Sequence, residues 1–369
     1  LTQLLHELLQ AYEQQQQLDA FGLHVYGMVL KSSGKKSVIP PNSPTPQAVL
    51  MQSLLLFPYN WSAWLDLADV VLNDSTIETE MEENLQSLNS HFMYHFFCGY
   101  VMSERQSHTQ AIALYERWMD GNLFGGSPYL LSQYAISSYH VKLYNNAKSV
   151  FQDLHHHMPY RLDFMDIYSN ILYVQQDSVA LSQLAHTAAL VDPYRAETCC
   201  IVGNYYSLKQ QRAKAIEYFQ RALALDRTFG AAWTLMGHEY IEWKQTAHAM
   251  ESYRNAIENS KHDYRAWYGL GQTYELLNMN LYSLYYYKKA AQLRPYDARM
   301  WCAMAIALEN LQKVPDAIQC YERAIQLDDS DVTGIQKLAK LYITTNQEEQ
   351  AAQCYMRHLE LVCLFVRCC

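Results

Sequence analysis

Apolar residues in the second half of the chain follow a helical spacing that restarts at a fixed interval. Between residues 196 and 358, large apolar and aromatic residues recur three and four positions apart, so they fall on one face of a helix. A small residue interrupts them once every 34 positions. These small residues are Gly203, Gly237, Gly271, Ala305 and Ala339. The pattern predicts five two-helix units, in which the small residue lets the two backbones approach where the helices cross.

Other positions of the unit repeat in the same register. Pro295 stands where a second helix must stop, because proline lacks an N–H and blocks continuation. A period of this length is the signature of tetratricopeptide (TPR) repeats, whose helix pairs bury their apolar faces by stacking. The predicted fold class is all-α, a TPR solenoid in which stacked helix pairs form a right-handed superhelix. Tryptophan predominates at the position four residues before each small residue, and we expect it to be largely buried there. The residues at this position are Cys199, Trp233, Trp267, Trp301 and Ile335.

The first half of the chain carries weaker copies of the unit, which close on Pro159 and Pro193. Because the chain begins at Leu1 rather than Met, we expect a fragment of a longer array. The predicted divisions are degenerate helices over 1–90, with a Pro/Ser-rich insertion at 31–47 and an acidic linker at 73–90, then degenerate repeats over 91–195, five regular repeats over 196–358 and an atypical tail over 359–369.

Charge and cysteine content narrow the class of protein. The chain has 28 basic and 37 acidic residues, a net charge of −9, which gives no electrostatic footprint for nucleic acid or anionic lipid. Its 9 cysteines form no C-x-x-C pair, as expected for reduced thiols packed as small apolar residues in a cytosolic or nuclear protein. No run of apolar residues is long enough to predict a membrane span.

Chemistry-bearing motifs are scarce. His155, His156 and His157 are adjacent, but neighbouring helix residues point about 100° apart, so the three cannot share one ion. A polar helix end before Pro159 is the favoured interpretation. The sequence contains no G-x-S-x-G, H-E-x-x-H or Walker motif. We therefore predict no catalytic residues, no metal site and no cofactor.

Polar residues outside the packing positions suggest a peptide-binding groove on the first helices of the regular repeats. Carboxylates predominate among them and favour a basic, Arg-containing ligand, since Arg pairs with carboxylates in a bidentate manner. A face of solvated charges is the alternative. The predicted groove residues are Asn204, Glu239, Glu242, Glu275 and Glu309, accompanied on the same exposed face by Ser207, His238, Gln272 and Asn310.

Other TPR functions remain as alternatives. A chaperone-type TPR domain clamps an acidic C-terminal peptide with Lys, Arg and Asn, which the acidic groove residues disfavour. RNA-reading helical repeats have a similar period, but the chain lacks a basic stripe. The chain could also be the TPR part of an enzyme whose catalytic domain lies outside it.

Several segments resemble one TPR family specifically. ETCCIVGNYYSLKQQ, GAAWTLMGHEYIEWK and DYRAWYGLGQTYELL, together with DAFGLHVYG and WSAWLDL near the start, are similar to the family of the eighth subunit of the anaphase-promoting complex (cyclosome). The resemblance covers roughly residues 1–358. It implies a non-catalytic scaffold subunit of a ubiquitin ligase that acts in the cell cycle, in the nucleus and the cytoplasm.

The resemblance also implies partners. Members of the family homodimerise through their N-terminal repeats, stack on sister TPR subunits and receive an Arg-containing coactivator motif in a C-terminal groove. Carried over by position, Asn204 and Glu239 are the expected pocket residues, with Glu242 nearby. The chain departs from the family where it begins inside the array, at the 31–47 insertion and in the 359–369 tail.

Overall fold

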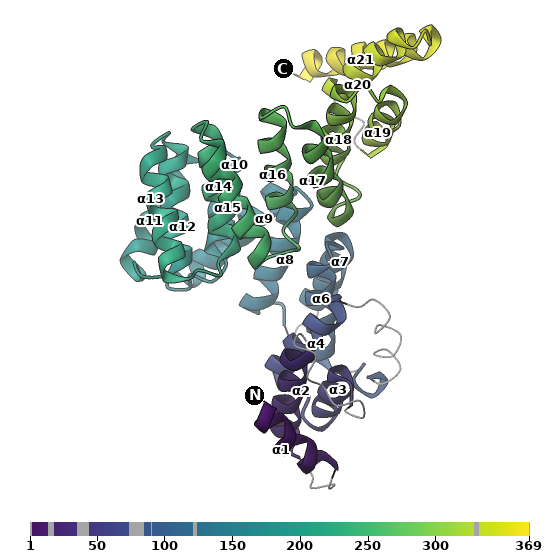
Figure 1. Ribbon diagram of the computed structural model, residues 1–369. Coiled ribbons are helices and arrows are strands. Elements are labelled where there is room, and N and C mark those ends of the chain that lie inside the picture. The colour runs from purple at the N-terminus through teal and green to yellow at the C-terminus, as the bar shows by residue number, and fades with distance from the viewer. Residues whose placement is uncertain are drawn as a thin grey trace. The chain divides into compact units, whose positions relative to one another are not determined.

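The computed structural model describes residues 2–13, 18–34, 44–73, 85–89, 91–120, 124–327 and 332–368. These residues form 20 α-helices and no strand, so the all-α prediction is confirmed. Their contacts divide the chain into two units, Leu1–Ala147 and Lys148–Cys369, which are described separately (Figure 1). No helix within the described ranges is long and apolar enough to cross a membrane.

One apolar core of the first unit contains the fully buried Trp64, whose Nε1 donates to the Pro58 carbonyl at 2.8 Å. Leu85 and Leu88, inside the predicted acidic linker, are buried in the same core. Helices also extend into both ends of the predicted 31–47 insertion; residues 35–43 and 74–84 lie outside the described ones. The elements are α1 (Thr2–Glu13), α2 (Ala20–Gly34), α3 (Pro46–Leu56), α4 (Trp61–Asn73), the 3₁₀ turn η1 (Gln86–Leu88), α6 (Phe92–Glu104), α7 (His108–Met119) and α8 (Pro128–His140).

The second unit is a succession of helix pairs that follows the predicted register (Figure 1). Its last helix runs to Cys368, so residues 359–368 of the predicted atypical tail continue that helix. The elements are α9 (Tyr144–His157), α10 (Met165–Val174), α11 (Ser178–Val191), α12 (Ala196–Leu208), α13 (Arg212–Leu225), α14 (Gly230–Glu242), α15 (Thr246–Asn259), α16 (Tyr264–Leu276), α17 (Asn280–Leu293), α18 (Ala298–Asn310), α19 (Val314–Leu327), α20 (Val332–Thr344) and α21 (Glu348–Cys368).

One type of turn joins the two helices of each pair from α6 to α21. After each first helix, a residue with a left-handed backbone (φ between 58° and 70°) is followed by a residue whose N–H donates to the carbonyl five positions back, as in a Schellman motif. In α12, for example, Gln211 N donates to Tyr206 O at 2.9 Å. The left-handed residues of these turns are Gln106, Lys142, Gln176, Gln210, Lys244, Asn278, Gln312 and Asn346.

The small residues lie where the sequence predicted, against an aromatic ring of the second helix. A Cβ built on Gly203 would come within 2.5 Å of Phe219 Cε1. The same contact joins Gly237 to Tyr253, at 2.6 Å. Because these rings are almost completely buried, an added side chain at Gly203 or Gly237 would have no free space where the helices cross.

The tryptophans of the repeats are partly buried, so the prediction that they are largely buried is wrong in degree. Trp233, Trp267 and Trp301 pack against the cores of their repeats. The indole Nε1 of each donates to the carbonyl six residues earlier, at 2.8 to 3.2 Å. The fully buried Trp64 makes the same bond to Pro58, so the bond does not determine the depth of the ring.

Replacing Gly203 by Ala should lower the free energy of unfolding by about 1 to 2 kcal/mol. Overpacking of a filled core costs roughly 1 to 3 kcal/mol, and the better helix propensity of alanine returns up to about 1 kcal/mol. Urea denaturation measures the difference. Gly230→Ala is the matched control, because the nearest atom to its Cβ would be Ser260 Cβ at 3.5 Å, an ordinary contact. Equal midpoints for the two variants would contradict the packing argument.

Candidate peptide-binding face

The predicted groove residues lie on the first helices of successive pairs, namely α12, α14, α16 and α18. We call Asn204, Ser207, Glu239, Glu242, Glu275 and Glu309 the first-helix face. Repeat stacking brings neighbouring first helices together, so a residue on one helix can contact the residue about 34 positions away on the next. The hydrogen bonds below follow that spacing.

Asn204 is buried, contrary to the exposed position predicted for it. Its side chain is 3% exposed. Its Nδ2 donates to Ser169 Oγ and to Asn170 Oδ1, both at 2.8 Å. Both acceptors belong to α10, on the preceding pair. The amide therefore ties two repeats together and is held in one orientation.

Glu239 is also buried, at 7% exposure, and is held by its neighbour on α12. Ser207 Oγ donates to Glu239 Oε1 at 2.5 Å and lies 3.3 Å from Tyr173 Oη of α10. None of the described residues forms a hydrogen bond to Glu239 Oε2. Burial raises the pKa of the Glu239 carboxyl, although the Ser207 hydrogen bond and the Arg212 charge act in the opposite direction.

Groups beside Glu239 are held in fixed states. Burial and the Arg265 charge lower the pKa of His238 to about 4, so this imidazole is neutral at pH 7. His238 Nδ1 forms a hydrogen bond with Tyr253 Oη at 2.7 Å. Arg265 lies against the carboxylate of Asp263, with Nε 3.0 Å from Oδ1. The cation that acts on His238 is thus already opposite a carboxylate.

The remaining predicted residues are less buried, and each has a partner within the fold. Glu242 is exposed, and its Oε2 lies 3.6 Å from the guanidinium of Arg212. Glu275 accepts from Tyr287 Oη at 2.6 Å, and Glu309 accepts from Tyr321 Oη at 3.2 Å. Glu275 is half-buried and Glu309 is exposed. Since Tyr287 and Tyr321 are buried, these two glutamates also anchor the rings that pack on the small residues.

The structure brings Asn204 and Glu239 to one region through α12, which carries Asn204 and, one turn later, the Ser207 that holds Glu239. It does not bring Glu275 and Glu309 into contact with this pair. The α10 residues Asn170 and Tyr173 were missed from the sequence. They stand 34 positions before Asn204 and Ser207, so the repeat period was the signal that could have found them.

The described residues contain no group of three or more His, Cys, Asp or Glu side chains placed to hold a metal ion. His155 to His157 form the end of α9, as the sequence indicated. The contacts of the first-helix face are hydrogen bonds and charge pairs.

Glu239→Gln should stabilise the chain increasingly as the pH rises. A carboxyl whose pKa is raised on folding binds more protons in the native state than in the unfolded state. The free energy of unfolding therefore falls as the pH rises from about 4.3, the pKa of an unperturbed glutamate, through the raised pKa of the folded chain. Glutamine keeps an oxygen for Ser207 and carries no charge. Urea unfolding at a series of pH values should show the difference in unfolding free energy growing in favour of Glu239→Gln. A difference that does not change with pH would contradict it; the exposed Glu242→Gln is the control and should change stability by less than about 0.5 kcal/mol.

Comparison with known families gives two matches in different parts of the chain. A family described as anaphase promoting complex subunit 8 / Cdc23 matches residues 1–135. The tetratricopeptide repeat family matches residues 196–229, 230–263 and 298–331. The second match agrees with the register of the regular repeats.

Individual proteins show the same resemblance. The chain is 41% identical over 191 residues to anaphase-promoting complex subunit 8 of Arabidopsis thaliana, a match that covers 52% of this chain and 30% of that protein. It is 43% identical over 196 residues to the subunit 8 of Dictyostelium discoideum, covering 53% and 31%. With the cell division cycle protein 23 homolog of Homo sapiens it shares 41% identity over 175 residues, covering 47% and 27%. The chain thus spans about three tenths of the length of these relatives.

A solved structure shares the fold. The crystal structure of the APC/C hetero-tetramer Cut9–Hcn1 is similar with a TM-score of 0.53 and 16% identity, covering 93% of this chain and 73% of that one. At that identity the likeness concerns the fold alone. The sequence matches confirm the resemblance: the chain contains tetratricopeptide repeats and is similar to the anaphase-promoting complex subunit 8 / Cdc23 family.

Proposed function

We propose that the chain acts as a non-catalytic scaffold in an anaphase-promoting complex, a ubiquitin ligase of the cell cycle. Its similarity to subunit 8 proteins of three organisms supports this role. Its partners are then sister TPR subunits and, through the N-terminal helices, a second copy of itself. Its location is the nucleus and the cytoplasm. A stack of helix pairs suits scaffolding, since each repeat offers its own surface to a neighbour.

The proposed ligand of the first-helix face is an Arg-containing coactivator peptide. The observation that carries this proposal is the Glu239 carboxylate, buried, held by Ser207 through one oxygen, and with no described hydrogen bond to the other. A guanidinium that approaches Oε2 would form a charge-assisted hydrogen bond in a partly desolvated site. Such a bond would favour the ionised carboxylate, which burial alone disfavours.

Asn204 contributes rigidity rather than a free amide. Both Nδ2 protons are engaged by Ser169 and Asn170, so its amide oxygen is the group left to meet a peptide N–H. The pair Asn204 and Glu239 thus offers two acceptors, one neutral and one anionic. Two acceptors fit an arginine and the backbone N–H beside it.

A chaperone-type clamp for an acidic peptide is less well supported. That function needs cations aimed at the ligand, whereas Arg212 and Arg265 already lie opposite Glu242 and Asp263. Binding an acidic peptide would require both ion pairs to open. The first-helix face would also present four glutamates to the incoming carboxylates.

Glu239→Gln should weaken binding of an Arg-containing coactivator peptide about ten- to a hundredfold, since a hydrogen bond to a charged group contributes roughly 1.5 to 3 kcal/mol. Titration of one labelled peptide by fluorescence anisotropy measures the change. Because Ser207 orients Glu239, Ser207→Ala should also weaken binding, by a smaller factor. The same peptide with Arg replaced by citrulline, which is uncharged and similar in shape, should bind the parent chain as weakly as the native peptide binds Glu239→Gln.

Glu275→Gln and Glu309→Gln are the matched controls, because these carboxylates lie one and two repeats further along. Both should bind the peptide like the parent. If Glu275→Gln loses binding and Glu239→Gln does not, the ligand site lies one repeat further on. If the citrulline peptide binds as tightly as the arginine peptide, charge pairing is not the basis of recognition.

The scaffold role itself is tested by expressing the tagged chain in cells and identifying the proteins that co-purify with it. Sister anaphase-promoting complex subunits should be enriched. Their absence, together with enrichment of chaperones, would support the alternative TPR function instead.

A further inference from the structure

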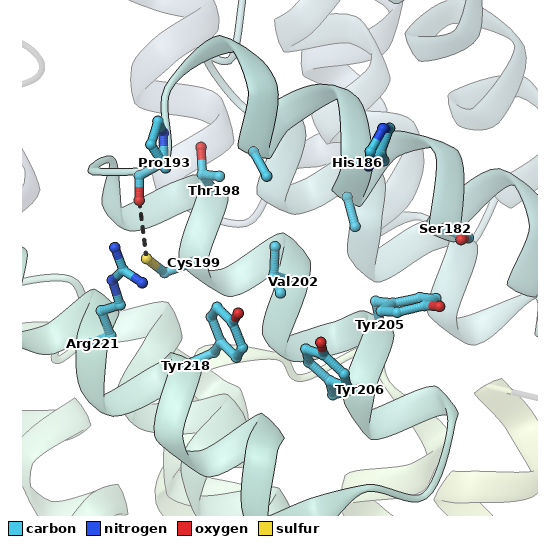
Figure 2. A pocket seen from close by; sticks show the side chains of 12 residues that line it. Ser182, His186, Pro193, Thr198, Cys199, Val202, Tyr205, Tyr206, Tyr218 and Arg221 are labelled. Atoms are coloured by element: carbon cyan, nitrogen blue, oxygen red, sulfur yellow. Dashed lines mark hydrogen bonds between the residues drawn. The ribbon is translucent and has the colours of Figure 1, made fainter.

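A pocket of about 300 Å³ lies on the opposite side of α12 from its contacts with Asn170 and Tyr173, between two second helices. Figure 2 shows its lining: Ser182 and His186 come from α11, Cys199 and Val202 from α12, and Tyr218 and Arg221 from α13. Cys199 lies at the bottom and is 2% exposed, whereas the His186 and Arg221 side chains are exposed at the rim. The pocket is independent of the first-helix face and plays no part in the proposed coactivator contact.

The pocket occupies the position that a tryptophan fills in three other repeats. Cys199 is the counterpart of Trp233, Trp267 and Trp301. In those repeats, the indole N–H donates to the carbonyl six residues earlier. Here the Cys199 thiol points at the equivalent carbonyl, that of Pro193, from 3.9 Å (Figure 2). The acceptor is retained, and a small side chain has replaced the ring.

The walls that surround an indole elsewhere are also retained. Two repeats later, Trp267 packs on Tyr286, with ring centroids 6.0 Å apart, and Tyr286 stacks on Tyr274 at 5.2 Å. The counterparts of those two tyrosines are Tyr218 and Tyr206, which stack on each other at 5.3 Å beside the pocket. The aromatic pair is therefore already in the geometry that receives an indole.

A cation that covers an indole elsewhere lies at the rim. Three repeats later, the Arg323 guanidinium lies 4.8 Å from the ring centre of Trp301. Its counterpart here is Arg221, which lies 5.7 Å from the ring of Tyr194 instead. Thr198, which also lines the pocket, is buried, and no described residue forms a hydrogen bond to its Oγ1. The pocket thus keeps an acceptor, an aromatic wall, a cation and a buried hydroxyl.

The next pocket along the chain follows the same rule. It is lined by Trp233 and by Ser252, and Ser252 is the counterpart of Tyr218 and Tyr286. There the tryptophan is present and the tyrosine is missing. Both pockets thus occur where one member of the Trp267–Tyr286 pair has a small replacement.

We propose that the pocket around Cys199 binds a tryptophan side chain from a peptide segment of a partner protein. The indole would donate its N–H to the Pro193 carbonyl, as all three internal tryptophans do to theirs. It would pack on Tyr218, as Trp267 does on Tyr286, and lie under Arg221, as Trp301 does under Arg323. Burial raises the pKa of the Cys199 thiol and so keeps it protonated, which suits a packing group at the floor. Aliphatic side chains lack both the donor and the π-face that these groups recognise.

The test mixes the full chain with a short Gly/Ser peptide that has one central tryptophan. Ligand-detected NMR measures the binding of the peptide. The peptide should bind saturably, and a matched peptide with leucine should bind at least about tenfold more weakly. Cys199→Trp fills the pocket with the residue of the sister repeats. It should abolish peptide binding and raise the thermal midpoint. Equal binding of the tryptophan and leucine peptides would overturn the proposal.

Two further variants keep the result interpretable if Cys199→Trp does not fold. Tyr218→Ser introduces the residue of the neighbouring repeat and should weaken the tryptophan peptide at least about fivefold, and Arg221→Gln should weaken it about two- to fivefold. Ser252→Tyr fills the neighbouring pocket and should leave binding unchanged. If Ser252→Tyr alone abolished binding, the tryptophan would be bound in the neighbouring pocket, and the proposal would be overturned. Trp243 is 45% exposed, so a second copy of the chain is another source of a tryptophan. Self-association that Trp243→Ala abolishes would identify that copy as the ligand and would also overturn the assignment.

Discussion

The crossing of two helices at a residue with little or no side chain is the constraint on which the array depends. The buried ring of a second helix, such as Phe219 or Tyr253, needs the space that Gly203 or Gly237 leaves open. The ring in turn fixes the distance between the helices, and that distance decides which residues reach the next repeat. The contacts of Asn204 with α10 and of Ser207 with Glu239 follow from this spacing.

Most of the fold could be predicted from the sequence because the same pattern of apolar and small residues recurs in each repeat. The register of the small residues, the helix ends near the prolines and the pairing of helices all follow from the 34-residue period. The depth of individual side chains did not follow from it. Trp267 is predicted by hydrophobicity to be largely buried, but its ring, which packs on Tyr286, is only partly buried.

For the first-helix face, the prediction from the sequence underestimated burial. Polar residues outside the packing positions were expected to be exposed, yet Asn204, Ser207 and Glu239 are buried. Their partners Ser169, Asn170 and Tyr173 belong to a repeat whose sequence has drifted from the consensus. A single-repeat pattern cannot show that a polar residue has a polar neighbour on the next helix. The cost of burying these groups is met by hydrogen bonds between repeats, so the polar face also holds adjacent repeats in register.

The turn within each pair has a consequence for how the chain folds. Because every turn is closed by a hydrogen bond between residues five apart and by one left-handed residue, the angle between paired helices is set locally. Contacts that are close in sequence form with little loss of chain entropy, so each pair can assemble before its neighbours do. Order can then begin in any pair and spread to the neighbouring pairs.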